Sequence, residues 1–369
     1  MFDYGKPVSG GNFYDRKLLK KQVANFIKDG VDFMIKAPRR YGKTSLVLNA
    51  LEDREFIYLD FRRVPRLSMV PEELLEQAYE IAGFKGFLAR AKENVVSLIR
   101  DARLSAKVDV SVIELGAEIV IKSEDEKSGC EKMIAALGVV ERVGESLGKK
   151  ITVVFDEFQD IKRLECEEGD ILEVLRGTLQ HKKWIHSIFL GSIESIMTKI
   201  FENRRSPFFN YCRKFSLEPF DIDELSKELI SAFRKKRMVF ENEKDLKELL
   251  KRLGGHPANT MQTMQALYYL CIENDLLLIK KEHLDKAYER AYYEQLDLIE
   301  QYVSEMKKRK HYYDVMYRMA RGEEQKLTPQ ALYQVRRGLV DMGLLMQRGK
   351  DEYIITDTFL KSYLEDGAV

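Results

Sequence analysis

The first 220 residues alternate between short, largely apolar runs and segments whose apolar residues recur at helical spacing. The runs lie at 33–35, 56–62, 151–155 and 184–192, and the amphipathic segments at 10–30, 44–51, 71–105 and 130–147. Apolar runs of this kind are typical of strands covered on both faces, as in a parallel sheet. The pattern therefore predicts an α/β core in which the helices supply that cover.

The stretch 107–122 departs from this alternation. Apolar and polar residues partly alternate on either side of Gly116, which predicts a β-hairpin inserted into the core. The charges in and just after it are mainly acidic, so we do not expect it to contact phosphate. Two interpretations stay open: a structural hairpin, or an appendage that contacts a partner.

From Asp221 the strand-like runs disappear, and helical periodicity continues to about residue 303. The sequence Gly254-Gly255-His256-Pro257 interrupts it and places a proline in the first turn of the next helix. We expect a core at 1–220 followed by a helical lid at 221–303.

The last segment, 304–369, predicts helices, two short strands joined by a charged turn, and a closing helix. Two such strands are typical of the wing of a winged-helix domain. Only one predicted helix separates Leu327 from this wing, where two are expected. The basic residues noted there are Arg336, Arg337, Arg348 and Lys350. DNA binding through a recognition helix and a packing or protein-contact role both remain open.

Bulk composition adds few constraints. The 369 residues are 45% hydrophobic and 33% charged, as expected of a globular protein. The net charge of +1 gives no overall attraction to nucleic acid or membrane, so either would need a local patch. The four cysteines lack zinc-site spacing, which favours a reducing compartment. Neither a signal core nor an apolar run of about 18 residues is present, so we expect a cytoplasmic protein.

A basic turn joins the first predicted strand to its helix, with the sequence Ala37-Pro38-Arg39-Arg40-Tyr41-Gly42-Lys43-Thr44-Ser45. A glycine-containing turn between strand and helix is the context of a phosphate-binding P-loop. We expect backbone N–H groups of 38–44, with Ser45 beside them, to wrap the β-phosphate. Lys43 would reach the β- and γ-phosphates, and Thr44 would bind Mg²⁺. Ala37 replaces the usual first glycine. A basic loop before an ordinary helix is the alternative.

The run at 151–155 ends in two carboxylates, Asp156 and Glu157, as a Walker B strand does. Phosphoryl transfer needs an acid on the magnesium side and a group that positions the nucleophile. We expect Asp156 to bind Mg²⁺ through its water shell and Glu157 to orient or deprotonate the attacking water. Many parallel strands end in an acid, so the two motifs support each other.

Two further polar positions are candidates for the reaction. Ser192 ends the last core run and would lie beside the γ-phosphate as a sensor, or else cap the next helix. Among Arg204, Arg205 and Arg213, we retain Arg213 as the candidate that stabilises γ-phosphate charge, in cis or in a neighbouring subunit. Ordinary surface arginines are the alternative.

Two turns could also contact the nucleotide. His256 and Pro257 begin a helix and could reach it, although a packed histidine is the alternative. The turn Phe13-Tyr14-Asp15-Arg16 either flanks a purine base or simply precedes a helix that packs on the sheet.

These motifs together resemble the archaeal-type ATPase family, which is grouped with the STAND and Orc/Cdc6-like branch of AAA+ and related P-loop ATPases. The matching segments are 13–16, 37–46, 153–159, 190–192 and 254–257. The resemblance implies an ASCE/AAA+-like P-loop core, a helical lid, a C-terminal winged-helix domain, and ATP or ADP with Mg²⁺ as ligands. Lys43, Thr44, Asp156 and Glu157 correspond directly, and Ser192 corresponds to the sensor.

We therefore expect an ATP-binding and ATP-hydrolysing switch that couples nucleotide state to domain rearrangement. One alternative is a DNA-engaging ATPase of the origin-binding or transposition-helper type. The other is a module that binds nucleotide without hydrolysing it. Beyond nucleotide, the expected partners are double-stranded DNA or a protein at the C-terminal domain, or further copies of the chain. No membrane partner is expected.

Overall fold

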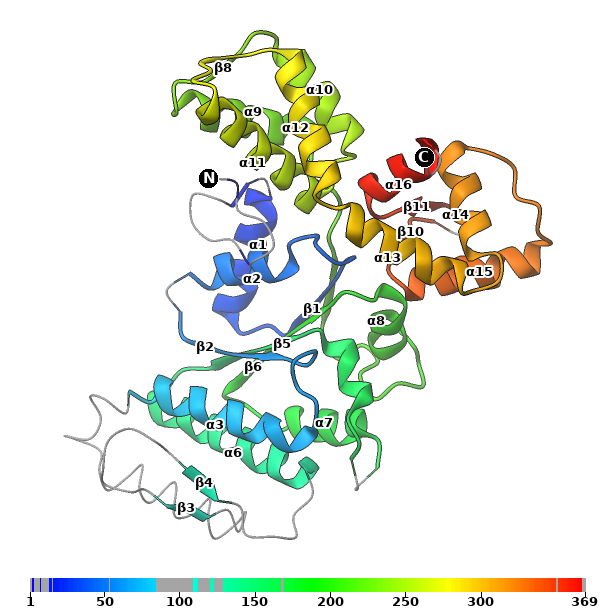
Figure 1. Ribbon diagram of the computed structural model, residues 1–369. Coiled ribbons are helices and arrows are strands. Elements are labelled where there is room, and N and C mark those ends of the chain that lie inside the picture. Colours follow the sequence, from blue (N-terminus) through cyan, green and yellow to red (C-terminus); the bar gives the residue numbers. More distant parts are fainter. Residues whose placement is uncertain are drawn as a thin grey trace.

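The computed structural model describes residues 2, 7, 13–14, 16–52, 54–83, 109–111, 120–122, 129–166, 169–349 and 351–366. Figure 1 shows a central sheet with helices on both faces, followed by two largely helical regions. Among the described residues, no helix is long and apolar enough to cross a membrane.

Five parallel strands form the sheet in the order β2-β5-β6-β1-β7. Their bounds are β1 (Phe33–Lys36), β2 (Phe56–Asp60), β5 (Ile151–Asp156), β6 (Ile185–Gly191) and β7 (Arg213–Ser216). The first four confirm the predicted strands. The sequence did not reveal β7, because this edge strand is mostly exposed and has no apolar run. Since β6 lies between β1 and β5, the ends of these three strands meet at one edge of the sheet.

Helices cover both faces of this sheet (Figure 1). They are α1 (Lys17–Asp29) and α2 (Lys43–Leu51) on one face, with α3 (Val70–Ile81), α6 (Gly129–Leu147), α7 (Ile171–Leu179) and α8 (Glu194–Phe201) on the other. Two short 3₁₀ helices, η2 (Leu67–Met69) and η3 (Phe158–Arg163), join the second group. Strand alternation divides the core, since Val154 packs in the α1–α2 cluster and Val153 and Phe155 in the other.

The predicted hairpin is present as β3 (Asp109–Ser111) and β4 (Val120–Lys122), which pair antiparallel. Its turn around Gly116 lies outside the described residues. The C-terminal part of the helix expected at 71–105 also lies outside them, beyond α3.

A disulfide joins Cys130 at the start of α6 to Cys166, which follows η3. The expectation of a reducing compartment, drawn from the cysteine spacing, did not anticipate this bond. The fold brings together residues 36 positions apart, and the spacing carries no sign of it. Cys212 and Cys271 are free thiols.

The region after the core contains α9 (Ile222–Arg234), α10 (Glu243–Arg252), α11 (Pro257–Glu273) and α12 (Lys281–Tyr293). The expectation of helices alone is wrong in one detail, because β8 (Val239–Phe240) and β9 (Leu278–Ile279) form a short parallel pair. At the turn before α11, the Phe220 N–H donates to the Gly255 carbonyl at 2.9 Å. A Cβ on Gly255, whose φ is +63°, would lie 2.6 Å from the Phe220 carbonyl oxygen, so only glycine fits here.

The final region contains α13 (Leu296–Lys307), α14 (Tyr312–Arg321), α15 (Pro329–Asp341), β10 (Leu345–Gln347), β11 (Tyr353–Ile355) and α16 (Thr358–Asp366). β10 and β11 pair antiparallel as the expected wing, and α15 is the single helix between Leu327 and that wing. One hydrophobic cluster runs through this region and the lid. The boundary expected near residue 303 falls within α13, and the division into domains stays a prediction.

Candidate functional site

The turn between β1 and α2 has the backbone shape of an anion-binding loop. Gly42 caps α2 with a φ of 78°, and Arg40 has a φ of 66°, so both are left-handed. Turns of this kind direct successive N–H groups toward one point ahead of a helix. Pro38 carries no N–H, so the set of predicted donors begins at Arg39. Ala37 is not left-handed, and alanine is therefore tolerated at that position.

Lys43 is buried below this loop, with 5% of its surface exposed. Its Nζ donates to the carbonyl oxygens of Ala37 at 2.8 Å and Pro38 at 3.0 Å. Burial lowers the pKa of Lys43 to about 8, although the charges of Glu157 and Asp156 oppose this shift. A buried ammonium is stabilised by an anion placed beside it. A phosphate oxygen held by the loop fits that role.

Thr44 and Asp156 lie side by side at the carboxyl edge of the sheet. Thr44 Oγ1 donates to Asp156 Oδ2 at 2.6 Å. The Glu157 N–H donates to the other oxygen, Asp156 Oδ1, at 2.8 Å. A hydroxyl and a carboxylate oxygen are ligands of the kind that Mg²⁺ prefers, with waters completing its octahedron. The two residues expected to hold Mg²⁺ therefore fit such an ion.

Glu157 is at the centre of a polar cluster. It adopts a left-handed conformation with a φ of 49° and follows the last residue of β5. Its Oε2 accepts from Ser192 Oγ at 2.5 Å and from Gln159 Nε2, and it pairs with Arg62 at 3.3 Å. Burial alone would raise the pKa of Glu157, but the Lys43 charge and these donors hold it below the usual value. The carboxylate is thus ionised at neutral pH.

Ser192 lies between the two motifs, immediately after β6. Besides Glu157, it contacts Gln159, whose Oε1 accepts from the Ser192 N–H at 3.2 Å. The N-cap of α8 is Ile193, and it makes no side-chain cap bond. Ser192 is therefore not the cap of α8, and its role as a sensor stays a prediction.

Arg213 lies away from this cluster, so it does not reach the site of its own chain, and a role in the site of a neighbouring subunit stays a prediction. It begins β7 and pairs in register with Phe33, the first residue of β1, whereas the P-loop follows the last residue of β1. Its side chain is exposed at the amino end of the strands. Arg204 and Arg205 are likewise exposed, in the segment after α8. The position of Arg213 could not be predicted, because β7 is a mostly exposed edge strand and has no apolar run in the sequence.

His256 and Pro257 lie at the start of α11, where His256 is 3% exposed. The His256 Nδ1 accepts from the Asn259 N–H at 3.1 Å, which makes the histidine a helix cap. Burial lowers its pKa to about 4, so it stays neutral and can accept that bond. Its ring meets the edge of Tyr41 at 5.1 Å. This arrangement is the packed histidine of the alternative interpretation, and it contacts the P-loop rather than presenting Nδ1 to a ligand.

Two other P-loop residues also reach beyond the core. Arg40 donates to Gln295 Oε1 at 2.9 Å and lies 4.0 Å from the carboxylate of Asp357. The Tyr41 hydroxyl donates to the Thr356 carbonyl at 3.5 Å. The loop thus contacts both the lid side and the C-terminal region directly. Arg39 is exposed, and Ser45 lies in the first turn of α2.

The turn before α1 is hydrogen-bonded to the backbone of the P-loop. Arg16 donates to the Tyr41 carbonyl and to the Glu218 carbonyl, both at 2.6 Å. Tyr14 is buried and stacks on Phe2 at 5.3 Å within the lid cluster. These contacts occupy Tyr14 and Arg16, two of the residues expected to flank a purine base. Phe13 packs against the α1–α2 cluster, and Asp15 lies outside the described residues.

Two side chains of this site were not predicted from the sequence: Arg62, which pairs with Glu157, and Tyr58, whose hydroxyl donates to Asp156 Oδ2. Both follow from strand order, because β2 is the neighbour of β5 and its carboxyl end therefore lies beside Asp156. Arg62 comes two positions after β2 and is the arginine nearest to Glu157 among the described contacts. The positions were readable from the sequence, but the pairing of the strands was not.

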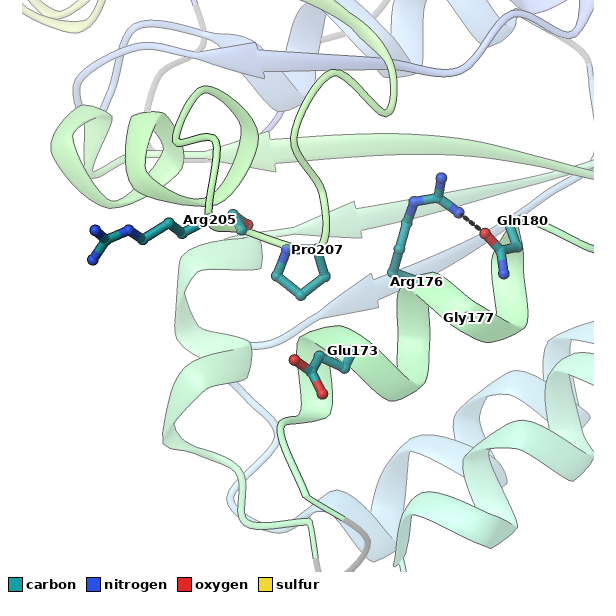
Figure 2. A pocket seen from close by; sticks show the side chains of 7 residues that line it. Glu173, Arg176, Gly177, Gln180, Arg205 and Pro207 are labelled. Carbon is teal, nitrogen blue, oxygen red and sulfur yellow. Dashed lines mark hydrogen bonds between the residues drawn. The ribbon is translucent and has the colours of Figure 1, made fainter.

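A surface depression of about 390 Å³ lies elsewhere on the core, between α7 and the segment after α8 (Figure 2). Its lining includes Glu173, Arg176 and Arg205 and no residue of the P-loop cluster. Arg176 is already bonded to Gln180 Oε1 at 2.7 Å and stacked 4.5 Å from the Tyr211 ring. The depression is therefore separate from the phosphate site.

No protein-family model matches the sequence, and no curated protein matches it either. Among solved structures, a Walker-type ATPase of Pyrococcus abyssi is 18% identical, with a TM-score of 0.69 over 98% of this chain and 99% of that one. The Aeropyrum pernix ORC2 protein in its ADPNP and ADP complexes is 11% identical, with a TM-score of 0.53 over 96% and 94%.

The likeness extends over nearly the whole length of each chain, through the sheet, the lid and the C-terminal region. At these identities the comparison establishes architecture. The chain has the fold of the AAA+-type P-loop ATPases, and the resemblance predicted from its motifs is confirmed at the level of the fold.

Proposed function

We propose that the protein binds ATP with Mg²⁺ at the P-loop, hydrolyses it, and couples the nucleotide state to the positions of the lid and C-terminal region. The observation that carries the proposal is the convergence of three groups on one edge of the sheet. These are the buried Lys43, the Thr44–Asp156 pair and the ionised Glu157. Acid, cation and oriented N–H groups in one place suit phosphoryl transfer and few other reactions.

Each residue has a distinct part in this chemistry. The N–H groups beginning at Arg39, together with Lys43, bind and orient the phosphates. Thr44 and Asp156 would hold Mg²⁺, which supplies charge neutralisation across the β- and γ-phosphates when bound. Glu157 orients the attacking water and accepts its proton, and Ser192 holds that carboxylate in place.

The coupling rests on Arg40 and Tyr41. Besides the packing of Tyr41 in the α1–α2 cluster, these P-loop side chains contact Gln295, Asp357 and Thr356. Phosphate binding fixes the backbone of the same loop, so it changes the positions from which both side chains extend. A nucleotide that favours one conformation of the loop then also favours one arrangement of the contacts that Arg40 and Tyr41 make with the lid side and the C-terminal region.

A double-mutant cycle tests this coupling. Arg40→Ala and Gln295→Ala are each expected to change affinity for a non-hydrolysable ATP analogue, and the double variant should show a coupling energy of about 0.5 to 1.5 kcal/mol. The nucleotide-induced change in radius of gyration by X-ray scattering should shrink in all three. Gln301→Ala, on an exposed position of α13, is the matched control. Fully additive affinities with an unchanged scattering response would contradict the coupling.

A second candidate, DNA engagement, is favoured by a basic turn that the sequence reasoning overlooked. Lys307, Lys308, Arg309 and Lys310 join α13 to α14, are exposed, and form no ion pair with a described residue. The Arg309 guanidinium lies 5.5 Å from the Tyr312 ring. Adjacent cations stacked on aromatic rings suit a phosphate backbone.

Of the basic residues first considered for DNA, two are less available, whereas Arg337 is exposed on α15. Arg336 stacks 5.0 Å from the Tyr353 ring, and Arg348 pairs with Glu218. Lys350 lies outside the described residues. In addition, Ser195 of α8 donates to Asp341 at the end of α15, which ties that helix to the core. The basic turn, rather than a recognition helix, is the surface this candidate function would use.

The salt dependence of duplex DNA binding tests this second candidate. Neutralising Lys308 and Lys310 to Ala should reduce the slope of log affinity against log salt by about 2, because each lost phosphate contact removes about 0.9. Lys235 and Lys236 on the lid, also exposed, provide a matched pair of neutralisations that should leave the slope unchanged. Equal slopes for both pairs, or no binding at low salt, would rule out this surface.

A further inference from the structure

Tyr58 makes a contact for which the proposed reaction has so far no use. Its side chain extends from β2, and its hydroxyl donates to Asp156 Oδ2 at 2.6 Å. Thr44 Oγ1 donates to the same oxygen at the same distance. Three donors therefore orient the Asp156 carboxylate, two on Oδ2 and the Glu157 N–H on Oδ1.

Tyr58 differs from the other two donors in what the proposed site requires of it. Thr44 is itself expected to be a Mg²⁺ ligand, and the backbone of Glu157 belongs to the turn that places the attacking water. Tyr58 has no such second task. A donor that bonds a ligating carboxylate from outside the metal fixes its direction and the oxygen that it presents.

The position of Tyr58 is in turn held from the edge of the sheet. The Tyr58 N–H donates to Gln77 Oε1 at 2.7 Å, and Gln77 Nε2 donates to the Tyr58 carbonyl at 3.0 Å. These bonds satisfy the outer edge of β2, the terminal strand of the sheet, from α3. Burial and the Asp156 charge raise the pKa of Tyr58, so its hydroxyl remains a donor at neutral pH.

We propose that Tyr58 is a positioning residue for Mg²⁺: anchored by Gln77, it holds the Asp156 carboxylate in the orientation in which it binds the ion together with Thr44. The inference rests on the proposed nucleotide and Mg²⁺ site. It adds a determinant of metal affinity on a strand that carries neither of the two nucleotide-binding motifs.

The test is the Mg²⁺ dependence of ADP binding, measured by calorimetry without turnover. Tyr58→Phe removes only the hydroxyl and should raise the half-saturating Mg²⁺ concentration about 10-fold or more, the usual effect of losing a group that orients a metal ligand. ADP affinity in EDTA should stay at the wild-type value. Tyr333→Phe, at a position 53% exposed, is the matched control and should change neither quantity.

Three results separate the possibilities. An unchanged Mg²⁺ requirement in Tyr58→Phe would overturn the inference while leaving the nucleotide site intact. An equal loss of ADP affinity with and without Mg²⁺ would also overturn it, because it would indicate general damage to the loop. Wild-type protein that binds no ADP under either condition would instead refute the proposed function itself. Should Tyr58→Phe fail to fold, Gln77→Ala is expected to raise the Mg²⁺ requirement several-fold, and no rise would count against the inference.

Discussion

Replacing Glu157 with Gln should reduce ATP turnover at least about 100-fold while ATP affinity stays near the wild-type value. The amide keeps the shape of the side chain and can still bond to Ser192, but it cannot accept a proton. In contrast, Lys43→Ala should abolish detectable nucleotide binding, because it removes the buried ammonium that lies directly against the loop carbonyls. Phosphate release and calorimetric titration with ATP measure the two quantities.

Glu173→Gln is the matched control for the first substitution, since Glu173 is exposed on α7 and lies outside the P-loop cluster. It should leave turnover and binding unchanged. Turnover that persists in Glu157→Gln would remove the assigned role of this acid. If the wild type binds ATP tightly but releases phosphate only at the background rate, the chain is the non-hydrolysing nucleotide module instead.

Breaking the Cys130–Cys166 disulfide by Cys166→Ser should lower the free energy of unfolding by about 4 kcal/mol. The estimate follows from the loop entropy that the cross-link removes from the unfolded chain, for a separation of 36 residues. The bond joins α6 to the segment that follows η3 in the sequence and lies away from Lys43. ATP affinity at moderate temperature should therefore not change. Denaturant titration with and without reductant measures the difference.

Cys212→Ser provides the control, because Cys212 is a free thiol only partly buried in the same core. It should unfold near the wild-type midpoint and keep its sensitivity to reductant, whereas Cys166→Ser should lose that sensitivity. A wild-type protein whose unfolding midpoint is the same in the presence and absence of reductant would contradict the prediction.

The core could be predicted from the sequence because strands that are buried on both faces have continuous apolar runs. The runs at 33–35 and 151–155 contain almost nothing polar, and each leads into a turn with a recognisable motif. β7 could not be predicted in this way, since an exposed edge strand needs no apolar run. The disulfide was missed for a related reason: only the folded chain brings Cys130 and Cys166 together.

The candidate site divides in the same way. Lys43, Thr44, Asp156 and Glu157 were found because local sequence determines a turn and the end of a strand. Tyr58 and Arg62 were missed because their relevance depends on β2 being the neighbour of β5, which is a property of the whole sheet. The distance of Arg213 from the cluster was not predicted, since nothing near it in the sequence shows at which end of a strand it lies.

The bond between Phe220 and Gly255 limits where the two halves of the molecule can move against each other. This bond fixes Phe220 to the lid. Three residues earlier, the Leu217 N–H donates to the Lys36 carbonyl at the end of β1, which fixes Leu217 to the core. If the lid rotates against the core as proposed, these two bonds leave Glu218 and Pro219 as the residues about which it turns. Arg16 donates to the carbonyl of Glu218 through one guanidinium nitrogen and to that of Tyr41 through the other. One side chain therefore bonds both this connection and the P-loop.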